Sequence, residues 1–380
     1  MMFEWFIYLL RFAEISALSY LLLIAAYTFG WFKLSKIAFP VENTTTSASI
    51  IIALRNEATS VIRLMKHLAN QQNMSTDLEI LLIDDHSDDE TTSLIISQLP
   101  LYPHVNFKLL LAEKTGKKEA ISQALKTASG QLILVTDADC QPGPFWAATM
   151  TTTYETYGAK LLLGPVLIDC SNRLFEKFQA LEFISLIGSA AGAAAIGWPS
   201  MANGANMAFE KQAFFEVDKL RNDASLASGD DVFLMTAIKQ HFGSKAIQFV
   251  AAETAVVPTK ASPNLKSFMH QRIRWVSKSS GYNQASILLP AWIVLIFNTI
   301  LVAMAISCFF IPWMLLLTVL FLSLKALIDL PLLHSVATFM RKRDLLKYFI
   351  PLTLIYPLYV VIVALLGIFG VVHWKGRKVK

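Results

Sequence analysis

The residues from Glu79 to Thr91 read EILLIDDHSDDET, and those from Gln131 to Asp139 read QLILVTDAD. Each stretch is a short apolar run that ends in aspartates. Continuous apolar runs of about four to eight residues are typical of strands that are buried on both faces of a sheet. The two stretches therefore predict buried strands whose carboxyl ends meet at an acidic edge.

Three further apolar runs of the same kind recur at intervals of about 25 to 30 residues. They are SIIIAL from Ser49, FKLLLA from Phe107 and KLLLGPV from Lys160. Between the runs, apolar residues follow the spacing of one helix face, first in Val61, Leu64, Met65 and Leu68 and then in Ala120, Ile121, Ala124, Leu125 and Ala128. Strands that alternate with helices predict an α/β fold with a mostly parallel, doubly wound sheet.

Ligands of such sheets bind beyond the carboxyl ends of the strands, which is where Asp84, Asp85, Asp137 and Asp139 lie in the sequence. Alternate residues of an extended chain share a face, so Asp137 and Asp139 can both reach one ligand. A divalent cation or a cationic ligand would relieve the repulsion among these carboxylates, and Mg²⁺ and Mn²⁺ prefer oxygen ligands together with substrate phosphates. Taken singly, each aspartate is equally typical of a helix cap or a solvated turn.

Several other functions lack support in the sequence. It contains no P-loop, no GxGxxG dinucleotide motif and no GxSxG nucleophile turn. The 33 basic and 28 acidic residues leave a net charge of +5, which is too small and too dispersed to indicate a nucleic-acid partner. Cys140, Cys170 and Cys308 lack the spacing of a zinc site or a disulfide framework, so we expect free thiols.

The composition indicates a membrane protein, because 54% of the residues are apolar and only 16% are charged, against roughly 25% charged in soluble domains. The 18-residue run from Ile15 to Phe32 carries no charge and is just long enough for a membrane-spanning helix. Lys33 and Lys36 follow it, so the positive-inside rule places the next segment in the cytoplasm. A cleaved signal peptide is the alternative, but the basic start and the small-residue cleavage site are missing.

The C-terminal quarter is predicted to cross the membrane more than once. The 46 residues between Lys278 and Lys325 carry no charge, which is enough for two spans of about 20 residues each. A basic linker from Arg341 to Lys347 precedes another uncharged run, from Tyr348 to Trp374. A third full span would place the basic tail outside, against the positive-inside rule; the tail consists of Lys375, Arg377, Lys378 and Lys380.

Two features of this region leave alternatives open. Pro351 and Pro357 could break the last apolar run into a re-entrant or interfacial piece. Lys325 and Asp329 are four residues apart and can pair on one helix face. Charges at membrane depth are functional candidates, although a mutually neutralised pair near a helix end explains these two equally well.

We therefore expect three parts in the chain: an N-terminal membrane helix in residues 1–40, a cytoplasmic α/β domain in residues 44–284 and a C-terminal membrane region in residues 285–380. Within the middle part, the stretch from Phe183 to Trp198 is apolar and rich in small residues. At 16 residues it is short for a span, and we expect it to lie at the membrane interface.

Seven motifs in consistent order resemble those of inverting, membrane-bound glycosyltransferases of family 2, which have the GT-A nucleotide-sugar-binding fold. They are SIIIALRNEA from Ser49, LLIDDHSDDET from Leu81, GKKEAISQAL from Gly116, DAD from Asp137, NGANMAF from Asn203, SGDDVFL from Ser228 and QRIRW from Gln271. Any one of these motifs is weak evidence, whereas their common order is strong. The pair Asp230-Asp231 departs from the Glu-Asp that is more common in the family.

The resemblance implies which residues bind the donor sugar. Nucleotide-sugar ligands would be Asn56, Glu57, Asp84, Asp85, Lys117, Asp137, Gln271 and Arg274, with Asp84 or Asp85 on the base. Asp137 and Asp139 would hold a divalent cation, Mg²⁺ or Mn²⁺, which stabilises the negative charge of the leaving diphosphate. The guanidinium of Arg274 can bond a phosphate in bidentate fashion.

The resemblance also implies the acceptor side of the reaction. Asn203, Gly204 and Trp275 would contact the acceptor, and the acidic pair Asp230-Asp231 would be catalytic. Asp231 would be the base that removes the proton from the attacking hydroxyl. The alternative for QRIRW is a basic amphipathic helix on anionic lipid, because cations are frequent in and near it: Lys260, Lys266, Arg272, Arg274 and Lys278.

The implied activity is metal-dependent transfer of a sugar, usually from a UDP-sugar, to a membrane lipid or a growing glycan. The implied setting is a multi-pass protein of the bacterial cytoplasmic membrane, with its catalytic domain facing the cytoplasm. Few membrane segments leave little room for a polymer channel in one chain, which favours a lipid or short-chain acceptor unless a homo-oligomer or a partner subunit forms. A processive polysaccharide synthase that passes its polymer through the membrane, and an inactive scaffold that binds the nucleotide sugar, remain alternatives.

Overall fold

The computed structural model describes residues 2–35, 44–74, 78–220, 230–369, 373–374 and 377–378. A few residues used above lie outside this part of the chain, namely Lys36, Ser228, Gly229, Lys375 and Lys380. The chain divides into two compact units. The helical unit contains residues 1–33, 170–196 and 262–380, and the α/β unit contains residues 34–169 and 197–261. Residues 170–196 and 262–284, expected above in the α/β domain, thus group with the helical unit.

The α/β unit is built on a seven-stranded sheet with the strand order β3-β2-β1-β4-β7-β5-β8. Its strands are β1 (Ala48–Leu54), β2 (Leu78–Asp84), β3 (Asn106–Leu111), β4 (Leu132–Thr136), β5 (Leu161–Leu163), β7 (Asn206–Glu210) and β8 (Ile247–Phe249). A separate two-stranded sheet pairs β6 (Val166–Asp169) with β9 (Val257–Lys260). The helices are α2 (Val61–Ala69), α3 (Thr91–Gln98), α4 (Lys117–Thr127), α5 (Trp146–Tyr157), α7 (Lys211–Val217) and α8 (Asp230–Phe242).

The predicted α/β architecture is confirmed. Strands β3, β2, β1 and β4 are mutually parallel, and β1, β2 and β4 are almost wholly buried, as their continuous apolar runs require. Helices α2 and α4 follow β1 and β3 at the residues where the apolar spacing predicted them. Strand β7 was not foreseen, and it runs antiparallel to both of its neighbours, β4 and β5.

The run KLLLGPV differs from the single strand that its composition predicts, because it divides between the two sheets. Strand β5 ends at Leu163 and β6 begins at Val166. A Cβ atom at Gly164 would lie 2.3 Å from the side chain of Asn206, so only glycine fits there. Pro165 has no N–H to donate to a ladder. The two residues together end one strand and redirect the chain into the other sheet.

The helical unit contains α1 (Met2–Lys33), α6 (Leu174–Ala195), α9 (Leu265–Ser277), α10 (Ala285–Ser307), α11 (Met314–Phe339) and α12 (Phe349–Phe369). A short hairpin of β10 (His373–Trp374) and β11 (Arg377–Lys378) follows. Five segments of the described chain are long and apolar enough to cross a membrane: Tyr8–Lys33, Leu174–Ala195, Ala285–Ser307, Met314–Phe339 and Arg343–Ile368. Large apolar side chains such as Phe12, Leu22 and Leu316 are exposed on them, as a lipid environment allows.

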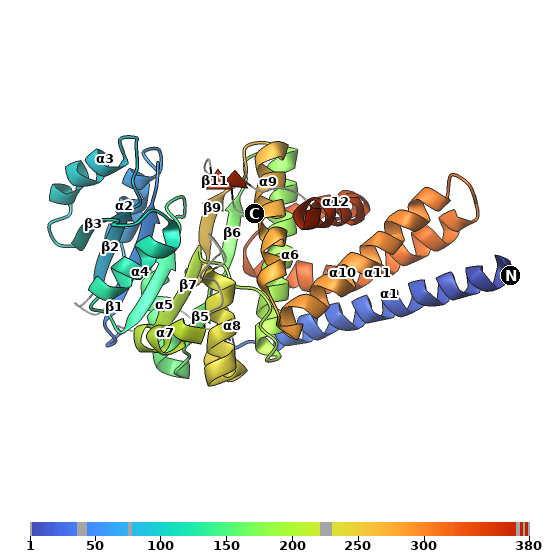
Figure 1. Ribbon diagram of the computed structural model, residues 1–380, viewed down its shortest axis with the longest axis horizontal. Coiled ribbons are helices and arrows are strands. Elements are labelled where there is room, and N and C mark those ends of the chain that lie inside the picture. Colours follow the sequence, from blue (N-terminus) through green and yellow to red (C-terminus); the bar gives the residue numbers. More distant parts are fainter. Residues whose placement is uncertain are drawn as a thin grey trace. The chain divides into compact units, whose positions relative to one another are not determined.

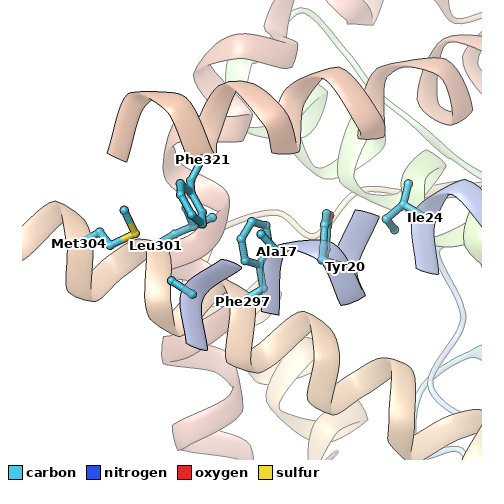
Figure 2. Close-up of a cluster of buried hydrophobic side chains, with 8 residues drawn as sticks. Ala17, Tyr20, Ile24, Phe297, Leu301, Met304 and Phe321 are labelled. Carbon is cyan, nitrogen blue, oxygen red and sulfur yellow. The ribbon is translucent and has the colours of Figure 1, made fainter. Parts of the chain in front are cut away.

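Helices α1, α10 and α11 lie side by side and run in a common direction (Figure 1). Figure 2 shows the apolar cluster that joins them, in which Tyr20 of α1 packs against Phe297 of α10 with ring centroids 4.8 Å apart. The cluster contains Ala13, Ala17, Tyr20, Ile24, Phe297, Leu301, Met304 and Phe321. Helix α12 is seen foreshortened in Figure 1, so it does not follow this direction.

Helix α6 crosses α1 at very close range and runs across the direction of α1, α10 and α11 in Figure 1. A Cβ atom at Gly192 would lie 2.1 Å from the carbonyl oxygen of Tyr27, and one at Gly30 would lie 2.2 Å from that of Gly192. Small residues at these positions let the two backbones meet. The small-residue stretch of the sequence is thus a helix-packing surface.

The pair Lys325–Asp329 forms within α11 and is joined by α1. The ammonium group of Lys325, whose side chain is only 3% exposed, donates to Asp329 and to the Tyr20 hydroxyl at 3.1 Å. Tyr20 in turn donates to Asp329 Oδ1 at 2.8 Å, and the ring of Tyr356 lies 4.9 Å from the Lys325 nitrogen. Each charge therefore has both an ionic and a hydrogen-bonding partner, which favours the mutually neutralised pair over a vacant functional site.

Replacing only one member of this pair should destabilise the helical unit. Lys325→Met leaves the Asp329 carboxylate without its counterion, and breaking a buried pair from one side costs roughly 3 to 5 kcal/mol. Lys325→Met/Asp329→Leu should recover most of that loss, because no orphaned charge remains. Thermal unfolding of the full chain in detergent or nanodiscs measures both variants. Equal melting temperatures for the single and double variants would contradict the pairing.

Glu79 is buried in the α/β unit, where it ties β2 to β1, to β3 and to the segment before β4. Its carboxylate accepts hydrogen bonds from the Ser49 hydroxyl at 2.5 Å, from Lys108 at 2.8 Å and from both the backbone and the hydroxyl of Ser129. Burial raises the pKa of Glu79, but these hydrogen bonds outweigh burial and lower the pKa to about 2. The ionised carboxylate is thus part of the folded unit.

The lowered pKa of Glu79 predicts a pH dependence of stability. A carboxylate whose folded-state pKa is lowered stabilises the fold above its ordinary pKa of 4.5, and that contribution is lost as the pH falls from 4.5 toward about 2. Glu79→Gln should therefore lower stability at pH 7 and flatten its decline between these values. Unfolding midpoints of the full chain at pH 7, 4 and 3 measure this. Parallel pH profiles for both proteins would show that Glu79 is not responsible.

Candidate active site

The candidate site lies at the edge of the sheet where β1, β2 and β4 end. These strands are parallel, so their carboxyl ends, at Leu54, Asp84 and Thr136, fall on the same side. Because β7 is antiparallel and Asn206 pairs with Thr136, this strand begins at the same edge. The sheet therefore brings the Asn203-Gly204 turn beside the aspartates that follow β4.

The two aspartates at the end of β2 have different partners. Asp84 accepts hydrogen bonds from the hydroxyl and from the backbone N–H of Ser87, the latter at 3.2 Å. Asp85 Oδ1 accepts from the backbone N–H of Gly116 at 2.8 Å and lies 3.9 Å from Arg55 Nη1. Asp84 thus closes the turn after β2, whereas Asp85 fixes the start of α4, where Lys117 lies.

Asn56 and Glu57 form a fixed turn after β1. Asn56 adopts a left-handed backbone conformation with φ of 54°, and its Oδ1 accepts from the backbone N–H of Asp88 at 3.0 Å. Glu57 Oε2 accepts from the Ser60 hydroxyl at 2.6 Å, and its N–H donates to the Thr91 hydroxyl at 2.8 Å. These bonds join the turn after β1 to the turn after β2.

A cation and two carboxylates meet around Gly204. The ammonium group of Lys117 donates to Asp137 Oδ1, and Asp231 Oδ2 accepts from the backbone N–H of Gly204 at 3.1 Å. A Cβ atom at Gly204 would lie 3.9 Å from Asp231 Oδ2 and 4.0 Å from Lys117 Nζ. Lys117, Asp137 and Asp231, predicted from separate motifs, are therefore close together in the fold.

Asp231 is held at the start of α8, the first residue of which is Asp230. Its Oδ1 accepts from the N–H of Val232 at 2.9 Å, while its Oδ2 accepts from Gly204. A negative charge at the start of a helix is favoured by the helix dipole. The carboxylate is thus oriented by two backbone donors from two different segments.

Asp139, the second aspartate of DAD, lies farther inside the site. Its Oδ2 accepts from the hydroxyl of Thr259, on β9, at 3.2 Å. Burial raises the pKa of Asp139, and the charges of Asp137 and Glu57 raise it further. Repulsion among carboxylates therefore exists here, as the sequence indicated, and a cation would relieve it.

The carboxylates of Asp137 and Asp139 suit a hard divalent cation whose other ligands come from a bound substrate. Asp137 and Asp139 supply oxygen, the element that Mg²⁺ and Mn²⁺ prefer. Among the residues that the structure describes, no group of three His, Cys, Asp or Glu side chains is arranged to hold a metal ion. Asp137 and Asp139 could be two ligands of such an ion, and oxygens of another molecule would have to supply the rest.

Asn206 is a positioning residue that sequence reasoning did not single out. Its Oδ1 accepts from Trp146 Nε1 at 2.9 Å, and its Nδ2 donates to the carbonyl oxygens of Pro165 and Ala255, both at 2.8 Å. The side chain is buried, and it anchors the beginning of β7 next to the Asn203-Gly204 turn. An amide directly before an apolar strand was the available signal.

Gln271, Arg274 and Trp275 lie on α9 in the helical unit. Gln271 Oε1 accepts from Arg272 Nη1 at 2.7 Å. Arg272 is only 3% exposed, so this cation is not part of a lipid-facing basic surface on α9, and Lys260 and Lys278 lie outside the helix, on β9 and in the turn after α9. A charged residue in an apolar helix face gives no sequence signal of burial unless its counterion is known.

The comparisons with known proteins agree with the fold and the motifs. Residues 49–216 match the family described as glycosyl transferase family 2, which confirms the resemblance inferred from the motifs. A beta-monoglucosyldiacylglycerol synthase from Nostoc sp. strain PCC 7120 is 30% identical over 27% of this chain. An undecaprenyl-phosphate 4-deoxy-4-formamido-L-arabinose transferase from Aeromonas hydrophila is 33% identical over 25% of this chain. The matched segments span only 22% and 30% of those relatives.

Among solved structures, a mannosyltransferase from Pyrobaculum calidifontis, determined in complex with GDP-Man and Mn²⁺, resembles the chain over most of its length. The alignment covers 93% of this chain and 97% of that one, with a TM-score of 0.57 and 17% sequence identity. The likeness confirms the GT-A type of fold.

Substituting Asn206 should loosen the edge of the sheet. Asn206→Asp keeps the acceptor for Trp146 but removes both donors and places a carboxylate against two carbonyl oxygens. Each buried group left without a partner costs about 1 to 3 kcal/mol, so we expect a loss of at least about 2 kcal/mol, larger than for Asn206→Ser. Denaturant unfolding of the full chain measures this. Wild-type stability in Asn206→Asp would contradict the anchoring role.

Proposed function

We propose that this chain, which carries a glycosyl transferase family 2 domain in residues 49–216, moves a sugar from a nucleotide-diphosphate sugar to an acceptor at a membrane, with inversion. The observation that carries the proposal is the meeting of Lys117, Asp137 and Asp231 around Gly204. A cation for phosphate, a carboxylate for metal and a carboxylate for proton removal thus surround one turn.

The donor nucleotide is assigned to the edge formed by the turns after β1 and β2. Asn56, Glu57 and Asp84 hold these turns in shape, and Asp85 is the carboxylate next to α4 that can bond the base. Lys117 follows Gly116 and supplies positive charge for the diphosphate. A UDP-sugar is the expected donor, and a GDP-sugar, as in the Pyrobaculum calidifontis complex, is the second choice.

Asp137 and Asp139 would hold Mg²⁺ or Mn²⁺ together with the diphosphate oxygens. When bound, such a cation neutralises the negative charge that develops on the leaving diphosphate. Thr259 orients Asp139 through its hydrogen bond. Lys117 donates to Asp137 and can supply positive charge to the same leaving group.

Asp231 is the proposed general base, with Asp230 beside it. Its carboxylate would remove the proton from the acceptor hydroxyl as the hydroxyl oxygen bonds to the anomeric carbon. The bond from that carbon to the diphosphate oxygen breaks on the opposite side, and the nucleoside diphosphate leaves with the electron pair. A single displacement of this kind inverts the anomeric configuration. Asn203 and Gly204, adjacent to the base, are assigned to the acceptor.

The QRIRW segment of α9 is assigned by resemblance. Arg274 and Gln271 would donate hydrogen bonds to the diphosphate, and the Trp275 ring would offer a flat apolar face to a sugar or lipid acceptor.

The helical unit is proposed to be a multi-pass membrane anchor with the α/β unit on the cytoplasmic side. Helices α1, α10 and α11, which lie side by side in Figure 1, would cross the membrane. Helices α6 and α12, which do not follow their direction, would lie along its surface. This arrangement places Lys33 and the Arg341–Lys347 linker in the cytoplasm, in agreement with the positive-inside rule.

A membrane lipid is the preferred acceptor. Three crossing helices enclose little space for a polymer, and the two curated relatives described above carry the names of enzymes that act on a diacylglycerol and on undecaprenyl phosphate. The chain matches only short parts of these proteins, so the acceptor rests on the membrane anchor and on the position of Asp231 in the site.

The proposed chemistry predicts that Asp231→Asn abolishes turnover. General base catalysis contributes about 100- to 10,000-fold, so release of nucleoside diphosphate should fall at least about 100-fold in this variant. Asp169→Asn, which changes an exposed carboxylate at the end of β6, is the matched control and should retain activity. Purified protein in lipid nanodiscs, a panel of UDP- and GDP-sugars, added lipid extract and Mn²⁺ or Mg²⁺ provide the assay.

The outcomes separate the alternatives. Turnover that disappears with EDTA and in Asp231→Asn supports the proposal, and the product mass distinguishes one transferred sugar from a polymer. Saturable donor binding without turnover for any donor would instead favour the scaffold. Full activity in Asp231→Asn would refute the assignment of the base.

A further inference from the structure

Arg272 is the charged residue of QRIRW to which the proposed chemistry gives no role, yet it is the most buried of the five residues. Its side chain is 3% exposed, whereas those of its neighbours Gln271, Arg274 and Trp275 are partly accessible. A guanidinium that is always charged is costly to bury unless it is paired. Its surroundings therefore show what its burial accomplishes.

Glu182 of α6 supplies the counterion. Arg272 Nη2 donates to Glu182 Oε2 at 2.6 Å, and Nε donates to Oε1 at 3.3 Å, which is a two-pronged arrangement. Tyr359 of α12 donates to the same Oε1 at 3.1 Å. The Glu182 carboxylate is also buried, with 5% of the side chain exposed. One ion pair thus ties together α6, α9 and α12.

The remaining terminal nitrogen of Arg272, Nη1, forms a hydrogen bond with Gln271. Nη1 donates to Gln271 Oε1 at 2.7 Å. Arginine has only donors, so the carbonyl oxygen of the amide must face it, and the amide NH₂ group is turned the other way. An amide that could otherwise present either end to a ligand is thereby fixed as a donor, the role that a diphosphate requires.

The guanidinium group of Arg272 packs against the ring of Trp275. The guanidinium carbon lies 4.2 Å from the centroid of the Trp275 ring and 4.6 Å from that of Phe268. Phe183 of α6 packs on the same tryptophan, with ring centroids 6.1 Å apart. Contacts between a cation and an aromatic ring are favourable and strengthen when the charge is desolvated. The orientation of Trp275 therefore depends on Arg272 and on α6.

We propose that Arg272, locked by Glu182, is a positioning residue that sets the amide of Gln271 and the ring of Trp275 for the donor diphosphate and the acceptor. This inference rests on the proposed transferase function. It assigns α6 a role in the reaction, because the lock for a motif on α9 is a carboxylate 90 residues away in sequence. A purely structural ion pair would hold α6 to α9 without selecting the orientation of either neighbour.

The experiment is a double-mutant cycle between Arg272 and Gln271. Arg272→Lys retains a charge for Glu182 but loses the planar fork that serves two partners. Arg272→Lys and Gln271→Ala are each expected to lower kcat/KM for the nucleotide sugar by about 10- to 100-fold. The double variant should be no worse than about twice the larger single loss, since Arg272 acts through Gln271. Lys266→Met removes an exposed cation of the same helix and is the matched control that should retain activity.

Each outcome supports or overturns the inference. Losses that multiply in the double variant, with a lowered melting temperature in Arg272→Lys, would reduce Arg272 to a structural pair and leave the proposed function intact. Restored activity in a charge-free pair, Arg272→Met/Glu182→Gln, would overturn the positioning role as well. No turnover by the wild-type protein with any donor would overturn the transferase function and this inference with it. Non-multiplying losses with unchanged melting temperatures would support the positioning role.

Discussion

The mutual repulsion of carboxylates at one edge of the sheet is the constraint on which the site depends. Parallel strands deliver Asp85, Asp137 and Asp139 to the same side, and an unrelieved cluster of that kind would oppose folding. The structure relieves it locally: Lys117 lies on Asp137, Arg55 stands near Asp85, and Asp231 is held by backbone N–H groups. Burial and the charges of Asp137 and Glu57 raise the pKa of Asp139. Repulsion among carboxylates thus persists at Asp139, which is one of the two residues proposed to hold the cation.

The helical unit also contains charged side chains that are buried among apolar residues. Its buried charges occur as pairs with further hydrogen bonds, Arg272 with Glu182 and Lys325 with Asp329, and each pair joins more than one helix. Burying a charge is costly, so pairs of this kind specify which helices meet more than they add stability. Helix α12 contacts both charged pairs, because its Tyr359 donates to Glu182 and its Tyr356 ring lies on Lys325.

Most of the α/β unit could be predicted because its signals are local. Apolar runs predicted β1 to β4, and the helical spacing of apolar residues between the runs predicted α2 and α4. The motifs predicted Lys117, Asp137 and Asp231 separately, and the fold brings these three candidate residues close together. The antiparallel β7 and the division at Gly164-Pro165 could not be foreseen, because Asn206, which lies at both places, bonds three segments that are distant in the sequence. The burial of Arg272 was not predicted for the same reason. Its partner Glu182 is 90 residues away, and a motif with several cations predicts exposure when its counterion is unknown.

The orientation of α12 decides whether the proposed membrane arrangement agrees with the positive-inside rule. If every long apolar segment of the C-terminal region crossed the membrane, the linker and the tail would lie on opposite sides although both are basic. A helix that runs across α1, α10 and α11 (Figure 1) removes this conflict, because the chain then crosses three times and returns to the same side. The Pro357 within α12 and the small-residue crossing of α1 by α6 suit a layer of helices at the interface. In the proposed arrangement only three helices cross the membrane, which leaves little room for a polymer channel within one chain, and the helices along its surface would lie at the level of a lipid acceptor's headgroup.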